Sequence, residues 1–251
     1  MFAFLKKITT RARPSSSRVP EGVRVYAVGD VHGRADLLQR LHLRMTEDAR
    51  SSPMEENVVV YLGDYVDRGL QVREVLDTLL TGLPEGFQAV YLRGNHEEMM
   101  LRFLEDPQHL EAWMSIGAQA TLMNYRVGVN GNGSTGKRAA EFREALRDAM
   151  PDDHLYFLRL LQTSFTLGDY YFVHAGVRPG RPLGSQKTED LLWIRDDFLS
   201  STSDFGARIV HGHSIVDQPE VRPNRISLDT GAYATGVLSC AVLEADQVRF
   251  L

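Results

Sequence analysis

The sequence predicts an α/β fold, and three observations lead to that prediction. Residues 23–104 alternate three times between a short apolar run and an amphipathic helical pattern. Residues 108–161 have mainly helical patterning, and strand-forming residues dominate from residue 163 onward. Strands that alternate with helices pair in parallel through right-handed crossovers, so we expect a sheet with parallel strands and helices packed against it.

The first half of the chain contains three strand–loop–helix units. Strands are predicted over residues 23–28, 58–62 and 87–92, and each leads into a helix. The apolar residues of the three helices recur at helical spacing: Leu37, Leu38, Leu41 and Met45; Val72, Val75, Leu76, Leu79 and Leu80; Met99, Met100, Phe103 and Leu104. Gly82 and Pro84 end the second helix.

The second half is expected to be rich in strands, with no further domain and no internal repeat. Strands are predicted over 163–167, 170–173, 207–210, 226–228, 237–243 and 248–251, with Val221 in another. A glycine-rich segment, residues 126–136, interrupts the preceding helical region. We expect this segment, residues 128–136 in particular, to form a mobile loop over or beside the functional site.

Composition excludes several classes of protein. The chain has 251 residues, 43% of them hydrophobic and 24% charged, as in an ordinary globular protein. Its net charge of −5 argues against nucleic acid as a partner. The single cysteine, Cys240, lies in an apolar run and rules out an intrachain disulfide, which favours a cytoplasmic location.

The first 21 residues differ in composition from the rest. An apolar start is followed by basic residues, proline and serines, and this order does not suit a secretory signal. We expect residues 1–21 to be a basic, flexible tail with at most a weak affinity for membrane surfaces, and residues 22–251 to be one folded domain. No apolar stretch in the sequence approaches the length of a membrane span.

One motif points to a different class, a nucleotide-binding protein. Residues 131–137 have the glycine and lysine spacing of a phosphate-binding P-loop. The next residue is Arg138, where that motif needs serine or threonine for magnesium, and no buried strand precedes it. A P-loop protein is therefore kept only as a remote alternative, which predicts ATP affinity that Lys137→Ala would abolish.

Metal-binding residue types follow several of the predicted strands. The polar residues at these strand ends are Asp30, His32, Asp64, Asp67, Asn95, His96, His174 and His213. Because the carboxyl ends of parallel strands gather at one crevice, we expect these side chains to converge. Carboxylate, amide and imidazole ligands without thiolate suit Mn, Fe or Zn. They are too many for one four-coordinate ion with an open position, which indicates two ions.

The motifs that hold these residues resemble a known family. Residues 29–33 (Gly-Asp-Val-His-Gly), 63–69 (Gly-Asp-Tyr-Val-Asp-Arg-Gly) and 93–97 (Arg-Gly-Asn-His-Glu) are similar to the signature of calcineurin-like metallophosphoesterases. Residues 174–176, 192–195, 212–214 and 228–232 agree with the serine/threonine phosphoprotein phosphatase branch, especially bacterial enzymes similar to bacteriophage lambda phosphatase. This resemblance runs from about residue 23 to the C-terminus. It implies a β-sandwich of two mixed sheets flanked by helices, in four αββα layers.

The resemblance also implies a set of metal ligands. The first metal would be held by Asp30 and His32, the second by Asn95, His174 and His213, and Asp64 would bridge the two. His213 is preferred to His211 because it follows the glycine, as the family's ligand does. Mn²⁺ is the expected ion, with Fe or Zn as alternatives.

Catalytic and phosphate-binding roles follow from the same resemblance. A metal-bridging hydroxide would attack the phosphorus in line, His96 would protonate the leaving alkoxide, and Asp67 would orient His96. The phosphate-binding residues would be Arg68, Arg93 and Arg195. A surface ion pair of Arg195 with Asp196 or Asp197 is a rival interpretation, and Trp193 is expected in the core.

The activity implied is the hydrolysis of phosphoserine or phosphothreonine in proteins. A symmetrical dinucleoside tetraphosphate hydrolase and a broad-specificity phosphoesterase remain alternatives. Asp67, Arg93 and Glu97 favour the protein phosphatases, because the dinucleotide hydrolases carry other residues there. The expected partners are phosphorylated proteins or small phosphoesters.

Overall fold

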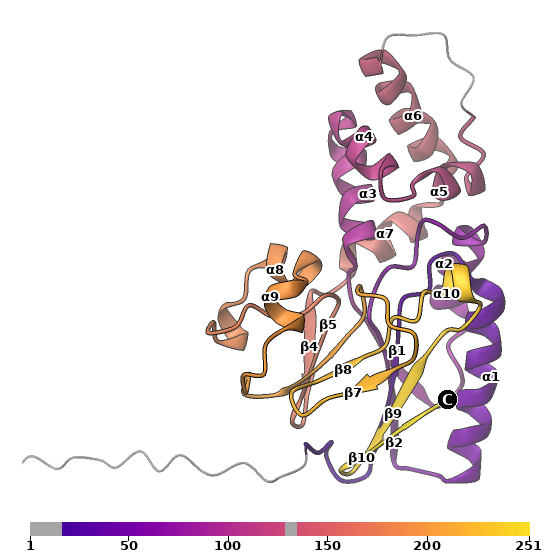
Figure 1. Ribbon diagram of the computed structural model, residues 1–251. Coiled ribbons are helices and arrows are strands. Elements are labelled where there is room, and N and C mark those ends of the chain that lie inside the picture. Colours follow the sequence, from indigo (N-terminus) through magenta and orange to yellow (C-terminus); the bar gives the residue numbers. More distant parts are fainter. Residues whose placement is uncertain (1–16, 129–134) are drawn as a thin grey trace, which may run out of the picture.

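The computed structural model describes residues 17–128 and 135–251, apart from the side chains of residues 135–137, and its core is two stacked β-sheets (Figure 1). The first sheet has the order β10-β9-β1-β2-β3. Its central strand β1 (Val23–Val28) pairs in parallel with β2 (Glu56–Tyr61), which pairs in parallel with β3 (Phe87–Tyr91). On its other side β1 pairs antiparallel with β9 (Cys240–Glu244), and β10 (Gln247–Phe250) forms the edge. The predicted parallel strands are thus confirmed.

The second sheet has the order β4-β5-β6-β8-β7. It is also mixed, because β5 (Tyr170–Val173), β6 (Arg208–His211) and β8 (Arg225–Ser227) run parallel. The edge strands β4 (Ser164–Leu167) and β7 (Glu220–Val221) are antiparallel to their neighbours.

Alternation along the strands explains why the two sheets stack. In β1, Val25 and Ala27 face the second sheet, whereas Tyr26 and Val28 belong to the cluster under the helices. In β5, Phe172 packs between the sheets. Successive side chains of a strand point to opposite faces, so each central strand can bury one face on a sheet and the other on helices.

Helices cover both outer faces. On the first sheet lie α1 (Ala35–Ser51) and α2 (Val72–Thr81), and the apolar stripe predicted for α1 is buried. On the second sheet lie α8 (Thr188–Trp193) and α9 (Asp196–Leu199), on the opposite side in Figure 1. The expected four-layer αββα sandwich is confirmed.

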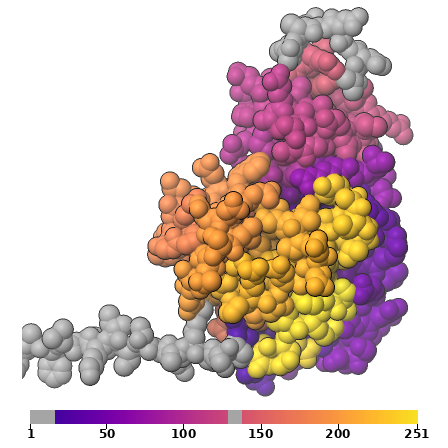
Figure 2. All heavy atoms as spheres, viewed as in Figure 1, coloured from indigo at the N-terminus to yellow at the C-terminus, as the bar shows by residue number. Residues whose placement is uncertain are grey.

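A helical lobe joins the two sheets in the sequence. It consists of α3 (Asn95–Glu105), α4 (Leu110–Met114), α5 (Gln119–Asn124), α6 (Thr135–Ala149) and α7 (Asp152–Leu160). Figure 2 shows that these helices rise as a projection above the body of the molecule. Short 3₁₀ turns at Pro107–His109 and Leu183–Ser185 and the short α10 (Ala232–Thr235) complete the described elements.

The predictions for the N-terminal tail and for the glycine-rich segment concern residues that the structure describes only in part. Most of the expected tail (residues 1–16) and residues 129–134 of the glycine-rich segment, which include the start of the P-loop-like motif, are not described. The described part of the expected tail packs on the body: Val19 is buried, its N–H donates to Ala245 O at 3.0 Å, and Arg18 N donates to Asp169 Oδ2 at 3.0 Å. No helix in the described parts of the chain is long and apolar enough to span a membrane.

Candidate metal centre

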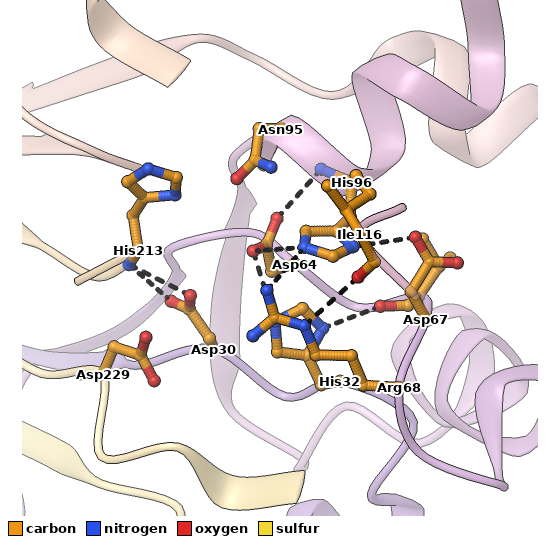
Figure 3. Close-up of polar contacts among 12 residues, drawn as sticks. Asp30, His32, Asp64, Asp67, Arg68, Asn95, His96, Ile116, His213 and Asp229 are labelled. Carbon is orange, nitrogen blue, oxygen red and sulfur yellow. Dashed lines mark hydrogen bonds and ion pairs between the residues drawn. The ribbon is translucent and has the colours of Figure 1, made fainter. Parts of the chain in front are cut away.

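The polar strand ends converge where the two sheets meet, as Figure 3 shows for most of them. The loops after β1, β2 and β3 bring residues 30–32, 64–68 and 95–96 together. The loops after β5 and β6 add His174 and His213 from the second sheet. The predicted convergence is therefore confirmed, and it draws on both sheets.

The turn after β2 has an unusual backbone. Asp64, Asp67 and Arg68 have φ angles of 52°, 69° and 66°, in the left-handed region that side chains other than glycine rarely adopt. Such conformations persist only where surrounding contacts hold them in place.

Glu97 provides many of those contacts. Its carboxylate accepts hydrogen bonds from the backbone N–H groups of Asp64 (2.9 Å), Tyr65 (2.7 Å), Val66 (3.1 Å) and Gly94 (2.8 Å). Burial and the charge of Asp64 raise the pKa of Glu97 to about 7, although the four N–H groups favour the carboxylate. Glu97 thus fastens the turn after β2 to the start of α3.

Asp64 lies at the middle of the cluster. Its Oδ2 is 3.4 Å from His32 Nε2 and 3.7 Å from His96 Nε2, whereas its Oδ1 is 3.4 Å from His174 Nε2. Burial alone would raise the pKa of Asp64, but the nearby His174, His96 and His32 hold it well below its usual range. The two oxygens of one carboxylate therefore face different imidazoles.

Hydrogen bonds to the backbone fix the orientation of two of these rings. His32 Nδ1 lies 2.9 Å from Val66 O, and His174 Nδ1 lies 2.9 Å from Leu62 O. An imidazole that donates from Nδ1 presents the lone pair of Nε2 to the site, as ring ligands of metals commonly do. Burial also lowers the pKa of His174, and it lowers that of His213 to about 2, which favours the neutral form of these two rings that metal binding requires. Although burial opposes it, Asp64 instead raises the pKa of His32.

The other two predicted ligands, Asn95 and Asp30, lie beside His174 and His213. Asn95 Oδ1 is 2.9 Å from His174 Nε2, and His213 Nδ1 is 3.2 Å from the same atom. Asp30 accepts hydrogen bonds from His213 N, at 3.0 Å to Oδ2. Burial and the charges of Asp229 and Asp64 raise the pKa of Asp30 well above its ordinary value.

These residues fit divalent metal ions. His32 Nε2 and His213 Nε2 are buried without a hydrogen-bond partner among the described residues, which is costly for polar atoms. Two groups of side chains have potential ligand atoms close enough to share an ion: His32, Asp64 and His96, and Asp64, His174 and His213. Asp64 belongs to both groups. Cations placed there would be coordinated by these two ring nitrogens and would offset the negative charge of the buried carboxylates.

His96 and Asp67 form a hydrogen-bonded pair beside the cluster. His96 Nδ1 is 2.8 Å from Asp67 Oδ2, and both residues are fully buried. The other ring nitrogen, Nε2, faces Asp64 and lies 3.2 Å from Arg68 Nη2. An imidazole that a carboxylate holds at one nitrogen, and that faces the site with the other, can exchange a proton there.

The three predicted phosphate-binding arginines lie in different surroundings. Arg68 points into the cluster, and its guanidinium lies 4.9 Å from the centre of the Tyr233 ring. Arg93 is held by Glu98 Oε2 at 3.1 Å and Arg159 O at 3.3 Å, and its buried Nε has no partner among the described residues. Arg195 is exposed, forms no ion pair with other described residues, and its charge acts on His213. The rival ion pair with Asp196 or Asp197 is not formed.

The structure also bears on His211, the histidine not chosen as a ligand, and on Trp193, which is expected in the core. His211 is buried away from the cluster, with its Nε2 2.9 Å from Ser227 Oγ. Trp193, expected in the core, is half-buried at the end of α8: it packs against the larger core cluster, and its ring stands edge-on to His213, with centroids 6.3 Å apart.

Sequence reasoning missed residues that contact the site from other parts of the chain. They are Trp113 and Thr121 beside Asp67, Tyr233 beside Arg68, and Asp229 beside Asp30. Asp229 lies in the motif at residues 228–232, although the sequence alone assigns no role to it, and Tyr233 follows closely, so the position of both beyond β8 could have pointed to the site. Trp113 and Thr121 are helical and carry no such signal.

Comparisons with known proteins agree with this geometry. A family model described as calcineurin-like phosphoesterase matches residues 23–237. Serine/threonine-protein phosphatase 2 of Salmonella typhimurium is 29% identical over 225 residues, which cover 86% of this chain and 90% of that protein. The asymmetrical bis(5'-nucleosyl)-tetraphosphatase PrpE of Anoxybacillus flavithermus is 25% identical, with 84% of this chain and 87% of that protein covered.

A solved structure shows the same fold. The cold-active protein-tyrosine phosphatase of a psychrophile Shewanella species superimposes with a TM-score of 0.58 at 16% identity, covering 93% of this chain and 80% of that one. At this identity the likeness concerns the arrangement of the two sheets and their helices.

Proposed function

Because the chain belongs to the calcineurin-like phosphoesterases, a family of metal-dependent hydrolases, we propose that it removes phosphate from phosphoserine and phosphothreonine residues of proteins. The observation that carries the proposal is the position of Asp64, whose two oxygens face separate groups of imidazoles. A carboxylate so placed can bridge two ions, and two-metal sites hydrolyse phosphoesters by in-line displacement.

We assign the ligands accordingly. Asp30 and His32 would hold one ion, Asn95, His174 and His213 the other, and Asp64 both. The oxygen and nitrogen ligands favour Mn²⁺, with Fe or Zn as alternatives. When bound, the ions would supply Lewis acidity, which would polarise the phosphoryl oxygens and lower the pKa of the attacking water.

His96 is the proposed general acid. Its Nε2 faces the cluster, where the leaving oxygen of a bound phosphoester would lie, and Asp67 fixes the ring from the other side. A proton delivered from Nε2 would neutralise the developing alkoxide, which is a poor leaving group without it.

Arginine side chains are proposed to bind the phosphate. Arg68 is already inside the site, where its guanidinium can offer a bidentate fork to the non-bridging oxygens. Arg195, whose charge acts on His213, and Arg93, whose guanidinium is held by Glu98 and Arg159 O, are proposed to join Arg68 in binding the phosphate.

The proposed substrates are phosphorylated proteins, and the proposed catalytic domain is residues 22–251 in the cytoplasm. The protein phosphatase relative, 29% identical along most of both chains, supports this specificity. The tetraphosphatase relative favours a second candidate, the hydrolysis of dinucleoside tetraphosphates.

A rate comparison on three substrates tests the proposal. The purified protein is treated with a chelator, restored with Mn²⁺, and assayed on a phosphoserine peptide, a phosphotyrosine peptide and diadenosine tetraphosphate. We expect chelation to abolish turnover, Mn²⁺ to restore it, and the phosphoserine peptide to have the highest kcat/KM.

A variant guards against contaminating enzymes. Asp64→Asn is expected to lose about 100-fold or more of the turnover while it keeps the fold, since it removes the central charge of the site. A higher kcat/KM on diadenosine tetraphosphate would favour the second candidate, and activity that survives chelation would contradict both.

A further inference from the structure

Two side chains of the helical lobe grip the carboxylate of Asp67. Trp113 Nε1 donates to Asp67 Oδ2 at 2.8 Å, and Thr121 Oγ1 donates to Oδ1 at 2.5 Å. The Thr121 hydroxyl also accepts from Asp67 N at 3.0 Å. Trp113, Thr121 and Asp67 are each fully buried, so water does not compete for these hydrogen bonds.

The same segment also holds the next residue, Arg68. Gly117 O accepts from Arg68 N at 3.2 Å, and Ile116 O accepts from Arg68 Nε at 3.4 Å (Figure 3). The segment from Trp113 to Thr121, which spans the end of α4 and the start of α5, therefore contacts both Asp67 and Arg68.

These contacts matter because the turn lacks regular secondary structure. Asp67 and Arg68 both have left-handed φ angles, and no strand or helix pairing fixes them. The Glu97 carboxylate anchors only residues 64–66 of the turn. The orientation of the Asp67 carboxylate is thus set from the helical lobe, by residues 46 and 54 positions away in the sequence.

We propose that Trp113 and Thr121 are positioning residues for proton transfer to the leaving group, an inference that rests on the proposed role of His96 as general acid. Their N–H and O–H groups hold the Asp67 carboxylate in the one orientation in which Oδ2 meets His96 Nδ1. Without them the carboxylate can rotate, and the His96 ring loses its alignment with the leaving oxygen. The segment from Trp113 to Thr121 is then part of the catalytic apparatus.

Dependence on the leaving group distinguishes positioning from a merely structural role. p-Nitrophenolate departs without protonation, whereas phenolate and alkoxides need a proton from a general acid. A defect in the acid therefore slows the hydrolysis of phenyl phosphate more than that of p-nitrophenyl phosphate. A general loss of packing slows both equally.

The experiment compares matched variants of the Mn²⁺-loaded full chain on these two substrates. Thr121→Val keeps the shape of the side chain but removes the hydroxyl, and Thr121→Ser keeps the hydroxyl. Trp113→Phe removes the indole N–H and keeps an aromatic ring. Phe103→Leu alters the same cluster, 5.2 Å from the Trp113 ring, without touching Asp67, and controls for repacking.

For Thr121→Val and Trp113→Phe we expect kcat on phenyl phosphate to fall about tenfold, which is part of the roughly 10²–10⁴-fold contribution of general acid catalysis, and kcat on p-nitrophenyl phosphate to fall less than about threefold. KM should change little. Thr121→Ser should recover most of the rate on phenyl phosphate, and Phe103→Leu should affect both substrates alike.

Equal losses on the two substrates in both variants would overturn the proposal. His96→Asn separates this result from a failure of the proposed function: if it shows no dependence on the leaving group, the general acid is wrongly assigned. If His96→Asn shows the dependence and the two lobe variants do not, only the positioning role is wrong. Thermal melting checks folding, and if one of the two variants does not fold, the other decides.

Discussion

Asp64 and Asp67 are both buried carboxylates of one turn, yet they have different neighbours. Asp64 faces imidazole nitrogens on either side, whereas Asp67 accepts hydrogen bonds from an indole, a hydroxyl and an imidazole. A carboxylate that already accepts three hydrogen bonds is poorly suited to bind a cation as well. The surroundings of each residue, more than its identity, separate a metal ligand from an orienting group.

Two neighbouring histidines allow a residue-level prediction about the metal. His213→Ala should lower the metal content of the protein and reduce kcat/KM at least about tenfold, because it removes a proposed ligand. His211→Ala should leave the metal content unchanged and cost only stability, since its ring is hydrogen-bonded to Ser227. Metal analysis of the dialysed proteins measures the difference. The opposite pattern would make His211 the ligand.

At the scale of elements, Glu97 joins the turn after β2 to α3, and its replacement should weaken that junction. Glu97→Gln puts an amide NH₂ where the carboxylate now accepts N–H groups, so at least one buried donor loses its partner. We expect the free energy of unfolding to fall by about 1–3 kcal/mol. Urea denaturation in the presence of a chelator measures this effect without a contribution from the metal.

The adjacent Glu98 serves as the control for that measurement. Its carboxylate is half-buried and paired with the arginines Arg93 and Arg102, to which a glutamine oxygen can still accept, so Glu98→Gln should cost less than Glu97→Gln. Equal effects of the two substitutions would show that the backbone hydrogen bonds of Glu97 contribute little to stability.

The turn between α4 and α5 yields a prediction about phosphate binding. A Cβ on Gly117 would lie 2.9 Å from Arg68 Cγ, and its φ of +119° is itself unfavourable for alanine. Gly117→Ala should therefore displace Arg68, raise KM several-fold and weaken inhibition by inorganic phosphate. Gly180→Ala, also at positive φ but with no atom within 4 Å of the new Cβ, is the matched control. An unchanged inhibition constant for phosphate would remove Arg68 from the binding site.

The order of elements could be predicted because apolar runs and polar strand ends are local patterns. The boundaries of strands are predicted less accurately. The apolar run predicts a strand over 58–62, but β2 begins at Glu56, because Glu56 N donates a hydrogen bond to Gly22 O although the Glu56 side chain is polar. Long-range partners could not be predicted. Trp113 and Thr121 have the sequence patterns of ordinary helix residues, and only the packing of the lobe brings them to Asp67.

At the scale of the whole molecule, His42 should make stability depend on pH. It lies between α1 and the first sheet, with Nε2 2.7 Å from Tyr61 Oη and Nδ1 3.0 Å from Gly82 O. Burial lowers its pKa from the ordinary value. The unfolded chain therefore binds a proton near pH 6.5 that the folded chain does not, and stability is lost as pH falls below about 6.5.

Comparison with His42→Gln isolates this contribution from the other histidines. Between pH 7 and 5.5, wild type should lose up to about 1 kcal/mol more of its free energy of unfolding than the variant does. Urea titrations of both proteins at the two pH values, with chelator present, give the difference. Equal losses in the two proteins would mean that the pKa of His42 is the same in the folded and the unfolded chain.

The proposed ligands come from both sheets: four follow β1, β2 and β3, while His174 and His213 follow β5 and β6. Bound ions would therefore cross-link the two layers of the sandwich at one end, in a chain whose only cysteine is buried in β9. Ligand binding to the folded state alone adds to its stability. Metal supply would then govern how long each molecule survives proteolysis as well as how fast it works.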